Sequence, residues 1–264
     1  MPFAEVNNTT LNYRFDGPAQ GPVIMLSNAL ASDLNMWEFQ IPALVRAGYR
    51  VLRYDSRGHG HSAVTKGPYS MALLAADAVG LMDALGLEKI HFCGLSKGGM
   101  IGQMLGTRYG DRLISLTLSS TAAYMAPKES WDERIATVRK HGMTVVAAAT
   151  INRWFTRDGQ IRLASAVEKI RRIILNTPVE GFCACCAAIR DMDQRETIRA
   201  VSTRTFVMVG EHDPGTPVSA AKLIHQGIAS SVLKIIPDAA HFVHMEQSSM
   251  FNKALLEFID TQDG

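Results

Sequence analysis

The stretch Gly94-Leu95-Ser96-Lys97-Gly98 holds a serine with a glycine two positions before it and another two positions after it. A short apolar run, residues 90–93, precedes the stretch, and a helical pattern, residues 100–109, follows it. A serine at a sharp turn between a strand and a helix is the context of a nucleophile elbow. The glycines give such a turn room, because side chains there would collide with the backbone. The pattern predicts that the Ser96 hydroxyl lies at a strand end, beside the amides of a helix N-terminus.

The composition limits the class of protein. A chain of 264 residues suits one α/β domain with an insertion, or two small domains. With 47% hydrophobic and 20% charged residues it is typical of a globular protein. A net charge of +2 without a basic block argues against a nucleic-acid partner. We see neither an apolar run of membrane-spanning length nor a signal-peptide pattern, and we expect a cytoplasmic protein with no membrane partner. The sequence leaves the oligomeric state open, a homo-oligomer included.

Short apolar runs alternate with helical patterns over much of the chain. The runs that predict strands are residues 23–26, 50–54, 90–93, 113–118, 205–209 and 232–236. Helices are predicted at residues 71–85, with Ser70 as the cap, and at 217–227 and 245–259. This alternation predicts an α/β fold with a mainly parallel sheet flanked by helices on both faces. Residues 3–6 and 11–15, around Asn7 and Asn8, predict a hairpin at the sheet edge.

The alternation stops near Thr121 and resumes near Thr203. Between them helical patterns cover residues 131–140, 144–154, 163–175 and 181–191. This segment is too long for a loop, so we expect residues 122–202 to form an inserted helical cap on a core built from residues 1–121 and 203–264. The cap carries 13 Lys and Arg against 9 Asp and Glu, a net charge of +4 in a chain of +2.

A serine hydroxyl needs a base within hydrogen-bond reach, and the base, usually histidine, needs an acceptor that fixes its tautomer. Asp213 follows the predicted strand 205–209, and His241 follows the strand 232–236. Residues at the carboxyl ends of neighbouring parallel strands converge on one crevice. We therefore predict a catalytic triad of Ser96, Asp213 and His241. His244 is the rival base, but it lies where the last helix begins.

Two clusters invite a metal interpretation. Three cysteines lie close together in the predicted helix 181–191: Cys183, Cys185 and Cys186. This segment has no histidine and the chain has no second cysteine cluster, so we favour packing as small apolar residues. His59 and His61 could form a metal pair, but we favour a glycine-built loop fixed by Asp55 and Arg57. The sequence predicts no metal site.

From residue 23 to residue 259 the chain resembles the α/β-hydrolases, whose triad follows the chain order Ser, Asp, His. More narrowly it resembles the 3-oxoadipate enol-lactonases of aromatic catabolism. The strings that carry the resemblance are LSNALASDLNMW (26–37), YDSRGHGHS (54–62), GPYS (67–70), LMDALG (81–86), HFCGLS (91–96), SWDER (130–134) and AAIRDMD (187–193). At the position of Lys97 the lactonases usually carry an apolar residue.

The resemblance implies hydrolysis of 3-oxoadipate enol-lactone, a small lactone that carries a carboxylate, with no metal or organic cofactor. It implies an oxyanion hole made by the amides of Lys97 and Ala29, or of Leu30 if the register differs by one residue.

The carboxylate of such a substrate needs a cation or amides in the pocket. Arg134 is the first candidate for binding it and Arg190 the second, because a guanidinium suits a carboxylate. Trp131 and Trp154 are candidate walls of the same pocket.

Other functions share the predicted triad. A C–C hydrolase of ring-cleavage products and a cofactor-free, haloperoxidase-like esterase are the enzymatic alternatives. A hydrolase-fold protein that binds a ligand without useful turnover is the alternative from another class.

Overall fold

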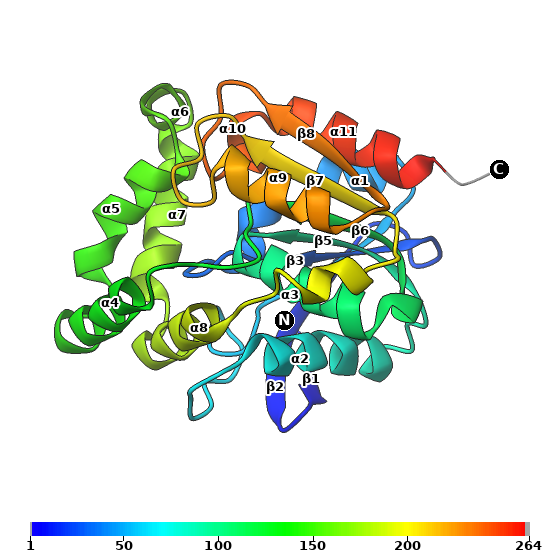
Figure 1. Ribbon diagram of the computed structural model, residues 1–264. Coiled ribbons are helices and arrows are strands. Elements are labelled where there is room, and N and C mark those ends of the chain that lie inside the picture. The colour runs from blue at the N-terminus through cyan, green and yellow to red at the C-terminus, as the bar shows by residue number, and fades with distance from the viewer. Residues whose placement is uncertain (1, 262–264) are drawn as a thin grey trace.

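A mainly parallel sheet forms the centre of the structure, a computed structural model that describes residues 2–261 (Figure 1). In this part of the chain eight strands follow the order β1-β2-β4-β3-β5-β6-β7-β8. They are β1 (Phe3–Val6), β2 (Thr9–Asp16), β3 (Val23–Ser27), β4 (Arg50–Tyr54), β5 (Ile90–Leu95), β6 (Leu113–Ser119), β7 (Thr205–Gly210) and β8 (Ser231–Ile236). Strands β3 to β8 pair in parallel, β2 joins β4 antiparallel, and β1 joins β2 antiparallel. The predicted fold class is confirmed.

The central strands and the hairpin at the sheet edge differ in their residue types. Every residue of β3, β5 and β7 is buried, as expected for strands that are covered on both faces. The first hairpin turns at Asn7 and Asn8, whose φ angles are 44° and 56°. Asparagine tolerates this left-handed region, which tight hairpin turns require at both central positions.

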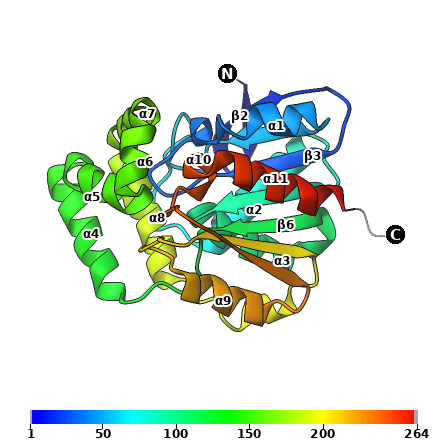
Figure 2. The ribbon, with the colours of Figure 1, turned by 90° about the horizontal axis from the view of Figure 1, so that it is seen from above.

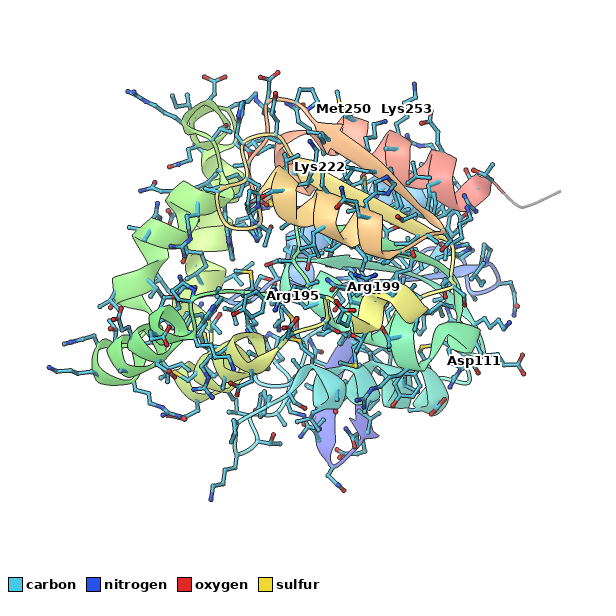
Figure 3. All side chains as sticks on the ribbon, viewed as in Figure 1. Asp111, Arg195, Arg199, Lys222, Met250 and Lys253 are labelled. Atoms are coloured by element: carbon cyan, nitrogen blue, oxygen red, sulfur yellow. The ribbon has the colours of Figure 1, made fainter. Side chains whose placement is uncertain are left out.

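Helices cover both faces of the sheet. Helix α11 and the short α10 before it lie with α1 on one face, and α2, α3 and α9 lie on the other (Figures 1 and 2). These helices are α1 (Ile41–Arg46), α2 (Met71–Ala84), α3 (Lys97–Arg108), α9 (Val218–Gly227), α10 (Val243–Glu246) and α11 (Ser248–Asp260). Short 3₁₀ turns are η1 (Leu34–Trp37), η2 (Gly110–Arg112) and η3 (Thr197–Ala200). Lys222 of α9 and Lys253 of α11 lie on the outer faces of these helices and point away from the sheet (Figure 3).

Of two helical predictions, one is confirmed and one needs adjustment. Ser70 caps α2 as expected, since its side chain accepts a hydrogen bond from the Leu73 amide. The helix expected over residues 245–259 is interrupted at Gln247, whose φ and ψ of −121° and 48° leave the helical region. It therefore appears as α10 and α11.

Five helices project beyond the carboxyl ends of the strands, to one side of the core (Figures 1 and 2). They are α4 (Lys128–His141), α5 (Thr144–Trp154), α6 (Arg157–Arg162), α7 (Ala164–Asn176) and α8 (Val179–Asp191). We call them the cap. The cap ends earlier than the predicted boundary at residue 202, because η3 packs against α3 and α9 of the core. No single helix within residues 2–261 is long and apolar enough to cross a membrane; α7 and α8 reach that length only together and are bent by 93°.

Candidate active site

Ser96 sits at the turn between β5 and α3 with a backbone that few residues adopt, φ 57° and ψ −115°. Its N–H donates to the Ser119 carbonyl at 2.9 Å, and its carbonyl accepts from the Thr121 hydroxyl at 2.8 Å. A Cβ on Gly98 would lie 2.1 Å from the Ser27 carbonyl oxygen, so only glycine fits there. A strained residue fixed from several sides is common where a side chain must be aimed into a site.

A hydrogen bond joins Asp213 to His241, which lines the cavity of Ser96. Asp213 Oδ2 lies 2.8 Å from His241 Nδ1, and Asp213 is buried. The other aspartate bonds come from the amides of Gly215 and Thr216, at 2.9 and 3.0 Å, and from the Thr216 hydroxyl at 2.8 Å. Burial opposes ionisation of Asp213, but the charge of His241 and these hydrogen bonds outweigh it and lower the pKa of the carboxyl. Asp213 can therefore hold the imidazole in one tautomer and stabilise its cation.

His244 occupies a different environment. It is fully buried, its Nε2 lies 3.1 Å from the Met36 carbonyl oxygen, and its ring packs against Trp37 and Phe242. Burial lowers its pKa to about 3. His241 lines the same cavity as Ser96, and His244 does not.

The loop after β3 offers two candidate amides for the second side of an oxyanion hole, those of Ala29 and Leu30. The Ala29 amide donates to Met36 Sδ at 3.4 Å, and Ala29 is fully buried. Leu30 lines the cavity beside Ser96, and within residues 2–261 its N–H has no acceptor. Of the two registers that the sequence left open, the geometry therefore favours Leu30 over Ala29. The other amide, that of Lys97, is the first of α3 and has no intrahelical acceptor.

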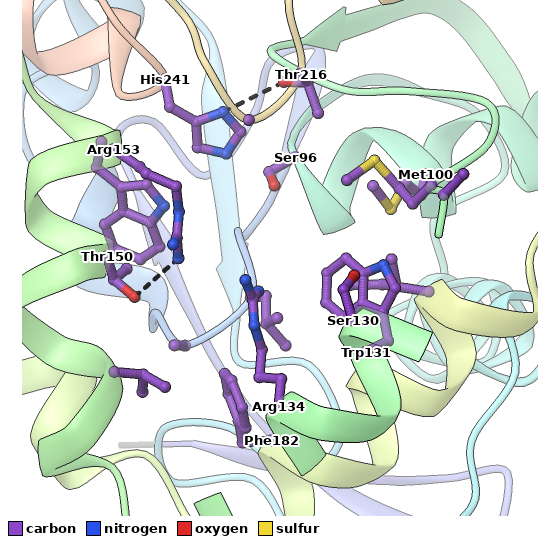
Figure 4. Close-up of a pocket in the computed structure, with 18 residues that line it drawn as sticks. Ser96, Met100, Ser130, Trp131, Arg134, Thr150, Arg153, Phe182, Thr216 and His241 are labelled. Atoms are coloured by element: carbon purple, nitrogen blue, oxygen red, sulfur yellow. Dashed lines mark hydrogen bonds between the residues drawn. The ribbon is translucent and has the colours of Figure 1, made fainter. Parts of the chain in front are cut away.

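A cavity of about 190 Å³ opens in front of Ser96, between the core and the cap (Figure 4). Helix α4 contributes Trp131 and Arg134, and α5 contributes Arg153 and Trp154. Trp154 stacks on Phe242, the residue after His241, with ring centroids 4.0 Å apart. The volume suits a ligand smaller than a drug-sized molecule.

Two arginines give this cavity a positive character. Arg134 lies over the Trp131 ring at 4.8 Å, and Arg153 Nη2 lies 3.4 Å from the Thr150 hydroxyl (Figure 4). Among the cavity-lining residues that the structure describes, none is acidic. Burial, together with the like charge of Arg134, lowers the pKa of Arg153. Two cations that pair with no carboxylate among residues 2–261 make the cavity suitable for an anion.

Comparison with known proteins agrees with this geometry. The alpha/beta hydrolase fold family matches residues 22–248. The chain belongs to this family.

Three relatives within this family are similar to the chain over nearly its full length. The hydrolase is 34% identical over 248 residues to 3-oxoadipate enol-lactonase 2 of Acinetobacter baylyi, covering 94% of this chain and 92% of the relative. The crystal structure of the enol-lactonase from Burkholderia xenovorans LB400 is 38% identical, with a TM-score of 0.95 and coverage of 98% and 100%. A thermophilic esterase from Thermogutta terrifontis, with malate bound, is 31% identical, with a TM-score of 0.90 and coverage of 96% and 93%.

One predicted binding residue of the hydrolase is misplaced. Arg190 pairs with Asp132 at 2.5 Å and with Asp191 at 2.8 Å, and it lies outside the cavity of Ser96. Arg153, which sequence reasoning missed, lines this cavity instead. Arg153 stands one residue before Trp154, the candidate wall residue, and this position on α5 was the available signal.

The metal alternatives find no support in the residues that the structure describes. Within residues 2–261 no group of three or more His, Cys, Asp or Glu could hold a metal ion. The cysteines of α8 are buried. His59 Nε2 accepts the Ala31 amide at 3.0 Å, and Asp55 fixes the same loop by accepting the amide of His61 at 2.9 Å.

Proposed function

We propose that this hydrolase opens 3-oxoadipate enol-lactone to 3-oxoadipate in the catabolism of aromatic compounds. The observation that carries the proposal is the pair of arginines, Arg134 and Arg153, which face the cavity of Ser96 without an acidic partner among its described lining residues. The enol-lactone carries one carboxylate, and its hydrolysis creates a second. The likeness to two enol-lactonases over nearly the full chain supports the same substrate class.

The first half of the reaction makes an acyl-enzyme. Ser96 Oγ attacks the lactone carbonyl carbon while His241 takes its proton, and Asp213 stabilises the imidazolium that forms. The oxyanion is held by the amides of Lys97 and Leu30, each of which contributes on the order of 3 kcal/mol. When the intermediate collapses, the ring C–O bond breaks and His241 returns the proton to the enol oxygen. The enol, now part of the acyl chain, becomes the ketone.

The second half releases the acid. His241 takes a proton from water, whose oxygen attacks the acyl carbon, and the same two amides hold the second oxyanion. Collapse breaks the bond to Ser96 Oγ and restores its proton from His241. The sum is one lactone and one water converted to the keto diacid.

The cap arginines act in binding. The substrate carboxylate lies at the far end of the ligand from the reacting carbonyl, so its contact with Arg134 and Arg153 is present in the ground state and in the transition state. Such a contact lowers KM more than it raises kcat. The aromatic faces of Trp131 and Trp154 enclose the ring between these two ends.

A panel of three substrates tests the proposal: the enol-lactone, a short acyl phenyl ester and a ring-cleavage dienoate. Wild type should hydrolyse the enol-lactone with a kcat/KM at least ~100-fold above the other two, since binding of a carboxylate and expulsion of an enol favour it together. Ser96→Ala should keep the fold and lose the turnover. Preference for the dienoate would indicate a C–C hydrolase, preference for the phenyl ester a general esterase, and no turnover of any substrate a binding protein.

A further inference from the structure

The loop that carries the Leu30 amide is held in a strained shape. Ala31, the next residue, has a φ of 59°, in the left-handed region that residues other than glycine seldom adopt. Such a conformation persists only where the surroundings fix it. A hydrogen bond from the Ala31 N–H to His59 Nε2, at 3.0 Å, fixes it here.

His59 accepts this bond from deep inside the protein. Its side chain is fully buried in the loop after β4, and its backbone N–H donates to the Ser56 carbonyl at 2.9 Å. A ring nitrogen that accepts a hydrogen bond carries no proton, so the bonding assigns the neutral tautomer with the proton on Nδ1. That nitrogen faces the Arg57 carbonyl at 3.4 Å and Cys185 Sγ of the cap at 3.9 Å.

Lys97 approaches the same loop from the other side of the oxyanion hole. Its side chain is fully buried, and its Nζ donates to the Ser56 hydroxyl. Burial and the nearby positive charge of Lys97 together lower the pKa of His59 well below its ordinary value. The neutral, accepting form of His59 is therefore the stable one.

We propose that His59 is a positioning residue for the oxyanion hole. It holds Ala31 in the left-handed conformation so that the Leu30 N–H faces Ser96 Oγ, and Lys97 reinforces this arrangement through Ser56. The two sides of the hole, the Lys97 amide and the Leu30 amide, are thus joined through one buried network. The inference rests on the proposed acyl transfer at Ser96 but not on the identity of the substrate.

Two conservative variants separate this role from a merely structural one. In His59→Gln the longer amide reaches the position of Nε2 and can accept the Ala31 N–H. In His59→Asn the shorter amide reaches only the position of Nδ1, so it can still face Arg57 and Cys185 while the Ala31 N–H is left unpaired. Both variants are polar, neutral amides in the same loop.

Steady-state kinetics should use the enol-lactone and a phenyl ester, together with inhibition by a trifluoromethyl ketone, whose adduct with Ser96 needs the oxyanion hole. We expect His59→Asn to lower kcat by ~100-fold on either substrate, to weaken the ketone by a similar factor, and to change KM by less than about threefold, because a lost oxyanion donor costs about 10²- to 10³-fold. His59→Gln should stay within about fivefold of wild type, since its amide can still accept the Ala31 N–H.

Equal losses in the two variants, or a wild-type kcat in His59→Asn, would overturn the inference. A preference for the phenyl ester would reject the proposed substrate but leave this comparison valid. If His59→Asn does not fold, ¹⁵N NMR of the wild type decides. A protonated Nε2 on His59 contradicts the inference, and a bare Nε2 coupled to the Ala31 amide supports it.

Discussion

The buried carboxylate of Glu246, in α10, accepts a hydrogen bond from the hydroxyl of Thr156, in the cap, at 2.6 Å. The same oxygen accepts the Thr156 amide at 2.9 Å, and the other carboxylate oxygen accepts the amide of Ala240 at 2.7 Å. Ala240 precedes His241, and the amide of Phe242, which follows it, donates to the Trp154 carbonyl at 2.8 Å. The residues before and after His241 are therefore both connected to the cap by hydrogen bonds, Ala240 through Glu246 and Phe242 directly.

Glu246→Gln should disturb this link. One end of the glutamine amide is a donor, so either the Ala240 amide or Thr156 loses its acceptor. We expect a lower Tm and a kcat/KM lower by ~10- to 100-fold, since small misplacements of a catalytic group have effects of this size. Thr156→Ser keeps both donors and serves as the matched control. Wild-type kinetics in Glu246→Gln would show that the link does not position His241.

The two histidines near the last strand should differ sharply. His241→Ala removes the base and should lower kcat by ~10⁴-fold or more. His244→Gln keeps a donor toward the Met36 carbonyl and should leave kcat within a few-fold of wild type. Steady-state assays of both variants make the comparison, and circular dichroism confirms that both fold. A larger loss in His244→Gln would reverse the assignment of the base.

Arg134 and Arg153 should act on substrates that carry a carboxylate. Each alanine variant should raise KM for the enol-lactone more than it lowers kcat, with a loss of ~10- to 150-fold in kcat/KM, because charge-assisted hydrogen bonds contribute about 1.5–3 kcal/mol. Hydrolysis of a neutral phenyl ester should change little. Arg190→Ala, in the cap but outside the cavity, is the matched control. Equal losses on both substrates would mean that the arginines only support the cap.

The stability of the protein should fall in mild acid, and His244 should cause part of the fall. Its pKa is about 3 in the folded state against an ordinary value of 6.5. Between these values the unfolded chain binds a proton that the folded protein excludes, so the free energy of unfolding decreases as the pH falls. From pH 7 to pH 5 one such group contributes a loss of about 2 kcal/mol. Urea unfolding at both pH values should show that much less loss in His244→Gln, and an unchanged loss would contradict the burial argument.

The convergence of Ser96, Asp213 and His241 could be predicted because each of them is marked by its neighbours in the sequence. Gly94 and Gly98 flank Ser96 at the spacing that a sharp turn needs, and Asp213 and His241 each follow an apolar run. Parallel strands bring such loops together whatever the details of packing. Which amide of the loop after β3 can face the cavity could not be predicted, because a shift of one residue changes the answer. The Ala29 N–H donates to Met36 Sδ and is therefore not free to face the cavity.

The cap residues could not be predicted to the same depth. Arg134, Arg153 and Arg190 all stand on helices, and the periodicity of a helix says which face is buried but not what that face meets. Arg190 forms ion pairs with Asp132 and Asp191, whereas Arg153 lines the cavity. Only the packing of α4 and α5 over the strand ends distinguishes them.

The most direct measurement is the kcat/KM of wild type for 3-oxoadipate enol-lactone against the same lactone with its carboxylate converted to a primary amide. The reacting ring is identical in both compounds, and only the charge that Arg134 and Arg153 are proposed to bind is removed. We predict efficient hydrolysis of the carboxylate form and a kcat/KM lower by ~10- to 150-fold for the amide, expressed mainly in KM. Equal kcat/KM values, or faster hydrolysis of the amide, would contradict the account.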